Sequence, residues 1–169
     1  MKILITGGLG FVGSNLTNFY IKNNHQVNIL DDFSTGKKQF LSSLDILDKV
    51  TVFRGSLNNL GDIEKSMEGC DLVCHLAANA DVRFGVEKPT KDLEINTIGT
   101  SNILLTMKKM SIKKIIFSST GSVYGKADQI PTKENSSFPI QTSFYGASKL
   151  AGEGLISSYC EAYNFQSWI

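Results

Sequence analysis

The feature that most constrains the fold is a hydrophobic run that ends in a cluster of glycines, Lys2-Ile-Leu-Ile-Thr-Gly-Gly-Leu-Gly-Phe-Val-Gly13. The apolar residues 3–5 predict a buried strand, and apolar residues recur with helical spacing from 11 to 20. The first N–H groups of a helix are unpaired, and glycine lets a backbone approach a pyrophosphate closely. Gly8, Gly10 and Gly13 fit G-x-G-x-x-G, and Gly7, Gly10 and Gly13 fit G-x-x-G-x-x-G. This strand–turn–helix pattern indicates a dinucleotide phosphate site.

An acidic pair follows the next predicted strand, residues 26–30. A carboxylate at Asp31 or Asp32 can accept hydrogen bonds from an adenosine ribose, and it would repel a 2′-phosphate. We therefore expect NAD rather than NADP. The alternative is an ordinary glycine turn in an α/β protein with an acidic residue after a strand.

Length and composition favour one domain over residues 1–169, because 169 residues with 41% hydrophobic side chains can bury one substantial core. The net charge of +1 argues against a nucleic-acid partner. No apolar run approaches the ~18 residues that span a bilayer, and a strand follows Met1 directly. These features predict a soluble, cytoplasmic protein without a membrane partner. We expect no metal site, because the few thiols and imidazoles form no ligand motif: Cys70, Cys74, Cys160, His25 and His75.

Strand and helix patterns alternate along the chain. Further strands are expected at 49–53, 71–76, 113–118 and near 164–169, and helices near 40–47, 59–67, 92–110 and from 145 onward. The strands are too apolar to face water, which is typical of a parallel sheet covered by helices on both faces. The predicted fold is therefore a doubly wound α/β sheet, a Rossmann fold. Residues 125–142 are expected to form a loop.

A tyrosine and a lysine, Tyr145 and Lys149, begin the last predicted helix and lie on one face, one turn apart. A tyrosine has an ordinary pKa of about 10, and an adjacent ammonium and a positive nicotinamide would favour the phenolate that acts as a base. On its own, Y-x-x-x-K is better explained by a tyrosine and a lysine that pack on a helix surface. Here it follows the glycine motif and a hydroxyl-rich turn that contains Thr120.

The chain resembles the extended short-chain dehydrogenase/reductases, and among them the NAD-dependent nucleotide-sugar epimerases and dehydratases. The resemblance covers essentially the whole chain. It rests on Thr6-Gly-Gly-Leu-Gly-Phe-Val-Gly-Ser14, Leu30-Asp-Asp32, His75-Leu-Ala-Ala78, Asn96-Thr-Ile-Gly-Thr100, Phe117-Ser-Ser-Thr-Gly-Ser-Val-Tyr-Gly125 and Tyr145-Gly-Ala-Ser-Lys-Leu-Ala-Gly-Glu153.

The resemblance implies roles for individual residues. Tyr145 would take the proton of a sugar hydroxyl. Lys149 would activate Tyr145 and bind a ribose of the cofactor, and Thr120 would hydrogen-bond the reacting oxygen. Hydride would pass from the sugar to NAD, giving a keto-sugar that turns and is reduced on its other face. The strand-end loops and the motif together give the predicted cofactor-binding set: Gly7, Gly10, Phe11, Val12, Gly13, Asp31, Asp32, Ser34, Gly36, Ser56, Leu57, Leu76, Ala77, Ala78, Tyr145 and Lys149.

Departures from the family pattern refine the predicted activity and cofactor contacts. Gly121 and Ser122 stand after Thr120 where related dehydratases carry an acidic residue, so epimerisation is favoured over dehydration. Ser56 replaces an aspartate that accepts from adenine, although a hydroxyl can also accept. Ala80 replaces a cofactor-contacting lysine of some epimerases. His75 could be an acid/base group, but a packed, hydrogen-bonded histidine is the preferred interpretation at the end of a buried strand.

Family members continue for about as many residues again, in a smaller substrate domain that this chain is expected to lack. Phe165, Trp168 and Ile169 would then lack the packing partners that later residues supply, and the chain alone would be poorly active. The resemblance also implies a nucleotide-sugar substrate, a UDP-sugar being favoured, and a homodimer of the full-length protein. Two alternatives stay open: a nucleotide-sugar dehydratase or reductase of the same family, and a non-catalytic NAD-binding module.

Overall fold

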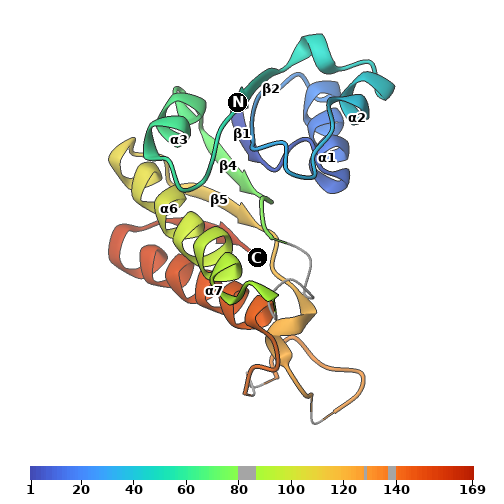
Figure 1. The fold of residues 1–169 in the computed structure, drawn as a ribbon. Coiled ribbons are helices and arrows are strands. Elements are labelled where there is room, and N and C mark those ends of the chain that lie inside the picture. The colour runs from blue at the N-terminus through green and yellow to red at the C-terminus, as the bar shows by residue number, and fades with distance from the viewer. Residues whose placement is uncertain (80–86, 128, 137–139) are drawn as a thin grey trace.

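The structure, a computed structural model, describes residues 1–79, 87–127, 129–136 and 140–169 (Figure 1). Its centre is one sheet of six strands in the order β3-β2-β1-β4-β5-β6, with every neighbouring pair parallel. The strands are β1 (Lys2–Thr6), β2 (Gln26–Asp31), β3 (Thr51–Arg54), β4 (Leu72–His75), β5 (Lys114–Phe117) and β6 (Gln166–Trp168). The strand order reverses direction at β1 and β4, which makes the carboxyl ends of these strands the expected ligand crevice.

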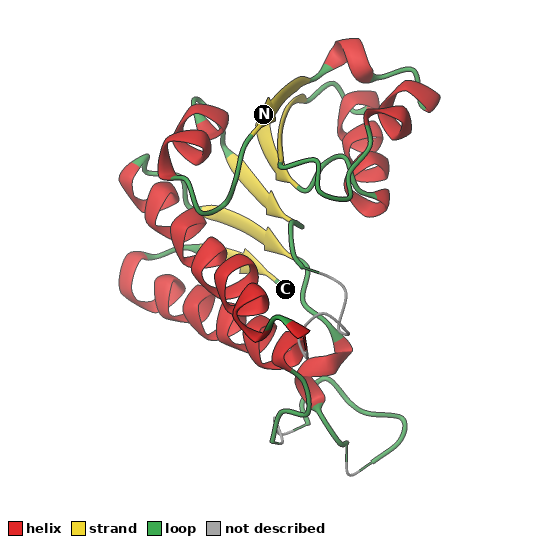
Figure 2. Ribbon diagram, in the orientation of Figure 1, coloured by secondary structure: helices red, strands yellow, loops and turns green. Residues whose placement is uncertain are grey.

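Helices cover both faces of the sheet (Figure 2), as the sequence predicted. One face carries α1 (Phe11–Lys22), α2 (Lys38–Ser43) and η1 (Leu47–Lys49); the other carries α3 (Leu60–Met67), α6 (Gly99–Lys109) and α7 (Phe144–Tyr163). Short elements precede α6 and α7: α5 (Pro89–Asp92), the π-helical η2 (Leu93–Ile98) and the 3-10 turn η3 (Gly121–Tyr124).

Alternate strand residues face two separate cores, because side chains of a strand point to opposite faces of a sheet. Ile3 and Ile5 join the core under α1, and Leu4 joins the core under α3, α6 and α7. All three are fully buried. This burial explains why the strands carry continuous apolar runs rather than an alternating pattern.

The helical spacing predicts α1 correctly and Tyr20 joins the core, but the two phenylalanines of the helix lie on its exposed side. Phe11 and Phe19 are 77% and 59% exposed, whereas Gly13 and Thr17 face the sheet. The Thr17 hydroxyl donates to the Gly13 carbonyl at 2.8 Å, so its burial leaves this group paired. Small residues on the inner face let α1 approach the strand ends closely.

Two further expectations are corrected. The helix expected over 92–110 is divided, since η2 interrupts it with a π-helical turn before α6. Phe165 does have packing partners: it is 5% exposed and stacks edge-on against Tyr159 at 5.4 Å. Trp168 and Ile169 are more than half exposed.

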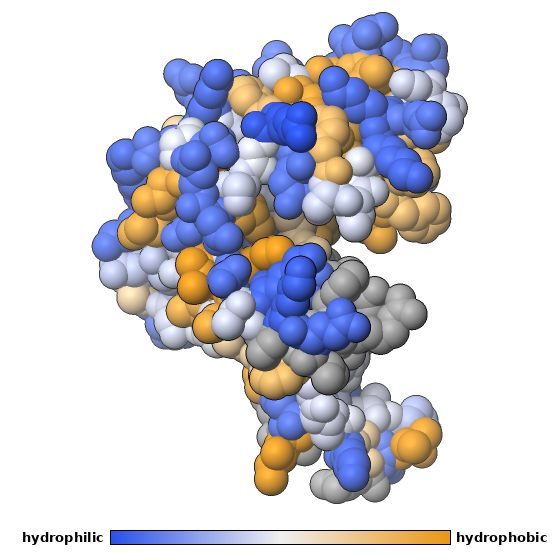
Figure 3. Space-filling model, in the orientation of Figure 1, coloured by the Kyte–Doolittle hydropathy of each residue, from blue (hydrophilic) through white to orange (hydrophobic). Residues whose placement is uncertain are grey.

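Polar and apolar side chains intermingle on the face of the molecule shown in Figure 3. No helix in the described part of the chain is both long and apolar enough to cross a membrane.

Candidate functional site

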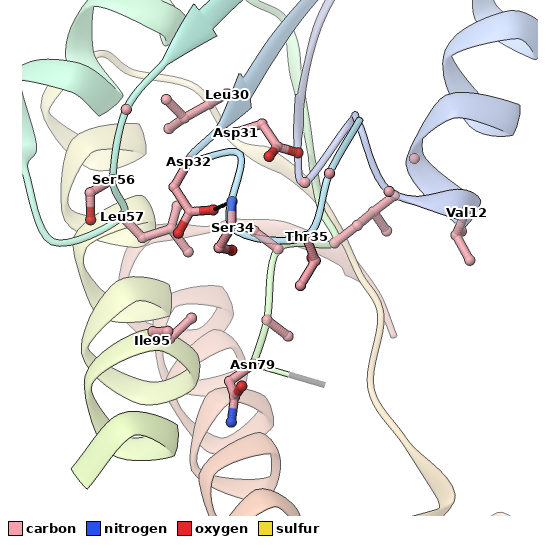
Figure 4. A pocket seen from close by; sticks show the side chains of 18 of the residues that line it. Val12, Leu30, Asp31, Asp32, Ser34, Thr35, Ser56, Leu57, Asn79 and Ile95 are labelled. Carbon is pink, nitrogen blue, oxygen red and sulfur yellow. Dashed lines mark hydrogen bonds between the residues drawn. The ribbon is translucent and has the colours of Figure 1, made fainter. Parts of the chain in front are cut away.

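A cavity of about 900 Å³ lies at the carboxyl ends of β1, β2 and β4, where the strand order predicts a ligand crevice. Figure 4 shows side chains from loops that are distant in sequence pointing toward this space. All predicted cofactor residues other than Tyr145 and Lys149 line it: Gly7, Gly10, Phe11, Val12, Gly13, Asp31, Asp32, Ser34, Gly36, Ser56, Leu57, Leu76, Ala77 and Ala78.

The glycine turn forms one end of the cavity, and two of its glycines are required by close contacts. Gly7 has a φ of +69°, and a Cβ there would lie 2.9 Å from the backbone nitrogen of Ala77. A Cβ at Gly13 would overlap the carbonyl oxygen of Gly7 and lie 2.7 Å from the Gly8 Cα. The N-cap residue of α1 is Gly10, which has no side chain to cap the first turn, so in the described part of the chain this N-terminus is open toward the cavity. Such a turn can receive a pyrophosphate.

The two aspartates after β2 differ in environment. Asp31 is buried, and its carboxylate accepts from the backbone N–H groups of Leu9 at 3.0 Å and Phe33 at 2.9 Å. Burial raises the pKa of Asp31 above its ordinary value, while these two N–H groups oppose the rise. Asp32 is exposed and accepts from the Ser34 backbone N–H at 2.8 Å. The Asp31 carboxylate therefore ties the glycine turn to the loop after β2.

The remaining strand-end loops complete the cavity wall. The Ser56 hydroxyl accepts from the Asn58 N–H at 3.1 Å, and the Ser56 N–H donates to Asp62 at 3.0 Å. Residues 80–86, which include Ala80, lie outside the described residues. Several residues that line the cavity are absent from the predicted cofactor-binding set: Leu30, Thr35, Gly55, Asn58, Asn79, Lys91 and Ile95.

The residues with predicted catalytic roles do not line this cavity. They lie around the end of β5 and at the start of α7. Thr120 caps η3, its hydroxyl oxygen accepting from the Ser122 N–H at 3.2 Å. A Cβ at Gly146, the residue after Tyr145, would lie 2.8 Å from the Ser122 carbonyl oxygen. The turn that carries Thr120 thus packs directly against the first turn of α7. Ser143 caps this helix and accepts from the Gly146 N–H.

Lys149 is almost fully buried on α7, at 2% exposure. Its ammonium lies over the Phe117 ring, 4.0 Å from the centroid. Burial lowers the pKa of Lys149 to about 8, and the negative charge of Glu153 opposes this change. A buried lysine that ionises near neutral pH is typical of a functional site rather than of a solvated surface.

A buried polar network connects the cavity wall to α7. Asn79, which lines the cavity, donates from its backbone N–H to Asn96 Oδ1 at 2.8 Å, and Asn96 Nδ2 donates to Ser148 Oγ at 3.0 Å. Ser148 directly precedes Lys149. Asp92 joins the network by accepting from the Asn79 side chain at 2.8 Å. These hydrogen bonds therefore fix the position of the helix that carries Tyr145 and Lys149 relative to the loop after β4.

His75 is a buried, hydrogen-bonded histidine, as the preferred interpretation predicted. The Thr100 hydroxyl donates to the Asn96 carbonyl at 2.6 Å, so its oxygen accepts from His75 Nε2 at 2.9 Å. Nδ1 then accepts from the Thr6 hydroxyl at 2.7 Å. Burial, assisted by the charge of Lys149, lowers the pKa of His75 to about 3. A neutral imidazole with its proton on Nε2 thus joins β1, β4 and α6.

The pH dependence of the free energy of unfolding should include a contribution from His75. The unfolded chain binds a proton near pH 6.5, and the folded chain does so only near pH 3. The free energy of unfolding should therefore fall as the pH is lowered from 6.5 toward 3, by up to about 1.4 kcal/mol per pH unit from this group. His75→Gln should remove this part of the slope in urea unfolding measured from pH 7 to pH 4. Since His25 is present in both proteins, its contribution cancels, and parallel curves would contradict the assignment.

The fold and the cavity define a Rossmann-like protein with a dinucleotide-type glycine turn. A family model described as the NAD dependent epimerase/dehydratase family matches residues 3–169. The chain belongs to that family.

Relatives and solved structures agree with this assignment. The chain is 40% identical over 167 residues to a putative UDP-glucose 4-epimerase of Methanocaldococcus jannaschii, covering 97% of this chain and 52% of the relative. It superposes with a TM-score of 0.90 on Thermus thermophilus UDP-glucose 4-epimerase in complex with NAD, at 32% identity and covering 99% and 53% of the two chains. A dTDP-glucose 4,6-dehydratase of Streptomyces venezuelae, with NAD bound, gives a TM-score of 0.90 at 25% identity, covering 99% and 54%. The chain thus spans about half the length of these relatives.

Proposed function

We propose that this chain is the cofactor-binding and catalytic part of an NAD-dependent nucleotide-sugar epimerase, with a UDP-hexose as substrate and C4 as the inverted centre. The observation that carries the proposal is the coexistence of two features. One is a glycine-turn cavity with a carboxylate at its adenosine end, and the other is a buried lysine one helical turn after a tyrosine. A module that only bound NAD would have no need of the second feature.

The residues of the cavity fit NAD. The tight turn that Gly13 makes against Gly7 and the open N-terminus of α1 suit the pyrophosphate. Asp31 and Asp32 stand where the adenosine ribose would lie, and their charge disfavours a 2′-phosphate. Ser56 and Leu57 would flank the adenine. When bound, NAD supplies a reversible hydride acceptor.

The chain's own residues would handle the proton. Tyr145 would accept the proton of the sugar hydroxyl, and the Lys149 ammonium would stabilise the resulting phenolate. The Thr120 hydroxyl would hydrogen-bond the reacting oxygen. The packing of η3 on the first turn of α7 supports this grouping, because it places the two hydroxyl-bearing segments side by side. Holding the reacting groups in place can lower a barrier by about 7–11 kcal/mol in favourable cases.

Dehydration is the second candidate, because the dehydratase from S. venezuelae shares the fold as closely as the epimerase does. Gly121 and Ser122 follow Thr120, and neither carries the carboxyl group that water elimination requires of an acid/base residue. This difference favours epimerisation. The substrate domain beyond this chain and the homodimer both remain predictions.

A panel of UDP-, GDP-, CDP- and dTDP-sugars, incubated with the full-length protein and NAD, tests the proposal. We expect interconversion of UDP-glucose and UDP-galactose with no net consumption of NAD. A 4-keto-6-deoxy product would assign the dehydratase function instead. Tight NAD binding without turnover of any nucleotide-sugar would favour a sensor.

A further inference from the structure

Glu153 lies where it can act on two of the proposed catalytic residues at once. It follows Lys149 by four residues on α7, so the two side chains share one face of the helix. The Ser119 hydroxyl donates to Glu153 Oε1. Ser119 directly precedes Thr120, so this hydrogen bond joins α7 to the backbone that carries the Thr120 hydroxyl.

The burial of Lys149 and the partial burial of Glu153 bear on both interactions. Lys149 is nearly excluded from water, and its ammonium faces the Phe117 ring rather than a carboxylate within ion-pair distance in the described part of the chain. The negative charge of Glu153 raises the pKa of Lys149 against the effect of burial, because the interior screens charge poorly. Glu153 and Ser119 are themselves only partly buried, so water reaches this side of α7.

We propose that Glu153 is a positioning residue for the reaction, orienting Thr120 through Ser119 and keeping Lys149 charged through its carboxylate. The proposal rests on the proposed function. It assigns to Glu153 two separable physical roles, a hydrogen bond and a charge, which substitutions can separate.

Other titratable groups on the elements packed around this part of α7 stay unchanged in the experiment. They are Tyr145 on α7, His75 on β4, Lys91 and Asp92 on α5, Glu94 on η2 and Tyr124 on η3. His75 is neutral above about pH 3, and so it adds no titration to the range of interest.

Three variants of the full-length protein separate the two roles. Glu153→Gln keeps an acceptor for Ser119 and removes the charge. Ser119→Ala removes the hydrogen bond and keeps the charge, and Glu153→Asp keeps the charge on a side chain too short to reach Ser119. Glu161→Gln removes a carboxylate from the exposed surface of the same helix and serves as the matched control.

The pH profile of kcat/KM gives the main readout. In Glu153→Gln the high-pH limb should move about 0.5–1 pH unit toward acid, because the uncompensated Lys149 loses its proton earlier. Ser119→Ala and Glu153→Asp should leave this limb in place and lower kcat by about 3- to 10-fold, with KM nearly unchanged, since one hydrogen bond is lost. Glu161→Gln should match the wild type in both respects.

The outcomes are distinguishable. A wild-type pH profile in Glu153→Gln overturns the charge role, and unchanged kcat in Ser119→Ala overturns the hydrogen-bond role. Thermal unfolding of each variant identifies any loss of activity that is caused by misfolding. If Tyr145→Phe retains full activity, the proposed function itself fails, whatever Glu153→Gln does. If Tyr145→Phe is inactive and the Glu153 variants behave as wild type, only the present proposal is lost.

Discussion

Replacing Tyr145 with phenylalanine should abolish most turnover, lowering kcat about 10²- to 10⁴-fold, because the variant keeps the ring and loses the proton acceptor. NAD affinity should change by less than about 10-fold, or 1.4 kcal/mol, since the glycine turn and the aspartates are untouched. Rates measured with UDP-glucose and NAD binding measured by calorimetry together check this prediction.

Tyr159→Phe is the matched control for Tyr145→Phe. Tyr159 lies on the same helix, but its ring packs against Tyr163 and Phe165, away from the turn of Thr120. This variant should keep wild-type turnover. Equal activities of the two variants would remove Tyr145 from the mechanism.

Replacing Gly13 with alanine should weaken NAD binding about 5- to 150-fold. The added methyl group would overlap the Gly7 carbonyl, and relieving such overpacking costs about 1–3 kcal/mol in the turn that receives the pyrophosphate. Calorimetric titration of the full-length protein with NAD measures the effect.

Gly154→Ala is the matched control, because it makes the same glycine-to-alanine change away from the glycine turn. Among the residues that the structure describes, none would lie within 4 Å of a Cβ at Gly154, and this glycine lies on the exposed surface of α7. Alanine there should leave NAD affinity unchanged and raise stability by about 0.5–1 kcal/mol, because glycine weakens a helix interior. Equal NAD affinities in Gly13→Ala and wild type would contradict the assigned role of the turn.

The sheet, the cavity and most of its lining could be predicted from the sequence because they follow from local patterns. The apolar run before Gly7 and the acidic pair after β2 are contiguous signals with a single structural explanation. Strand-end loops meet at one edge of any parallel sheet, so the sequence predicts that Ser56 and Ala77 line the same cavity, as they do.

The remaining features depend on contacts that leave no local pattern. Gly13 packs closely on the glycine turn, and Phe11 and Phe19 lie on the exposed side of α1. The bond between Ser119 and Glu153 spans 34 residues, and that between Asn96 and Ser148 spans 52. The motifs containing these residues were visible in the sequence, but nothing in their spacing indicated their partners.

The most direct test of the central claim follows the hydrogen atom at the inverted carbon. The full-length protein with NAD would be given UDP-glucose deuterated at C4, and the UDP-galactose formed would be analysed by mass spectrometry and NMR. If the reaction proceeds by hydride transfer to bound NAD and back, the product retains deuterium at C4. Formation of UDP-galactose carrying solvent hydrogen at C4, or no UDP-galactose at all, would contradict the account.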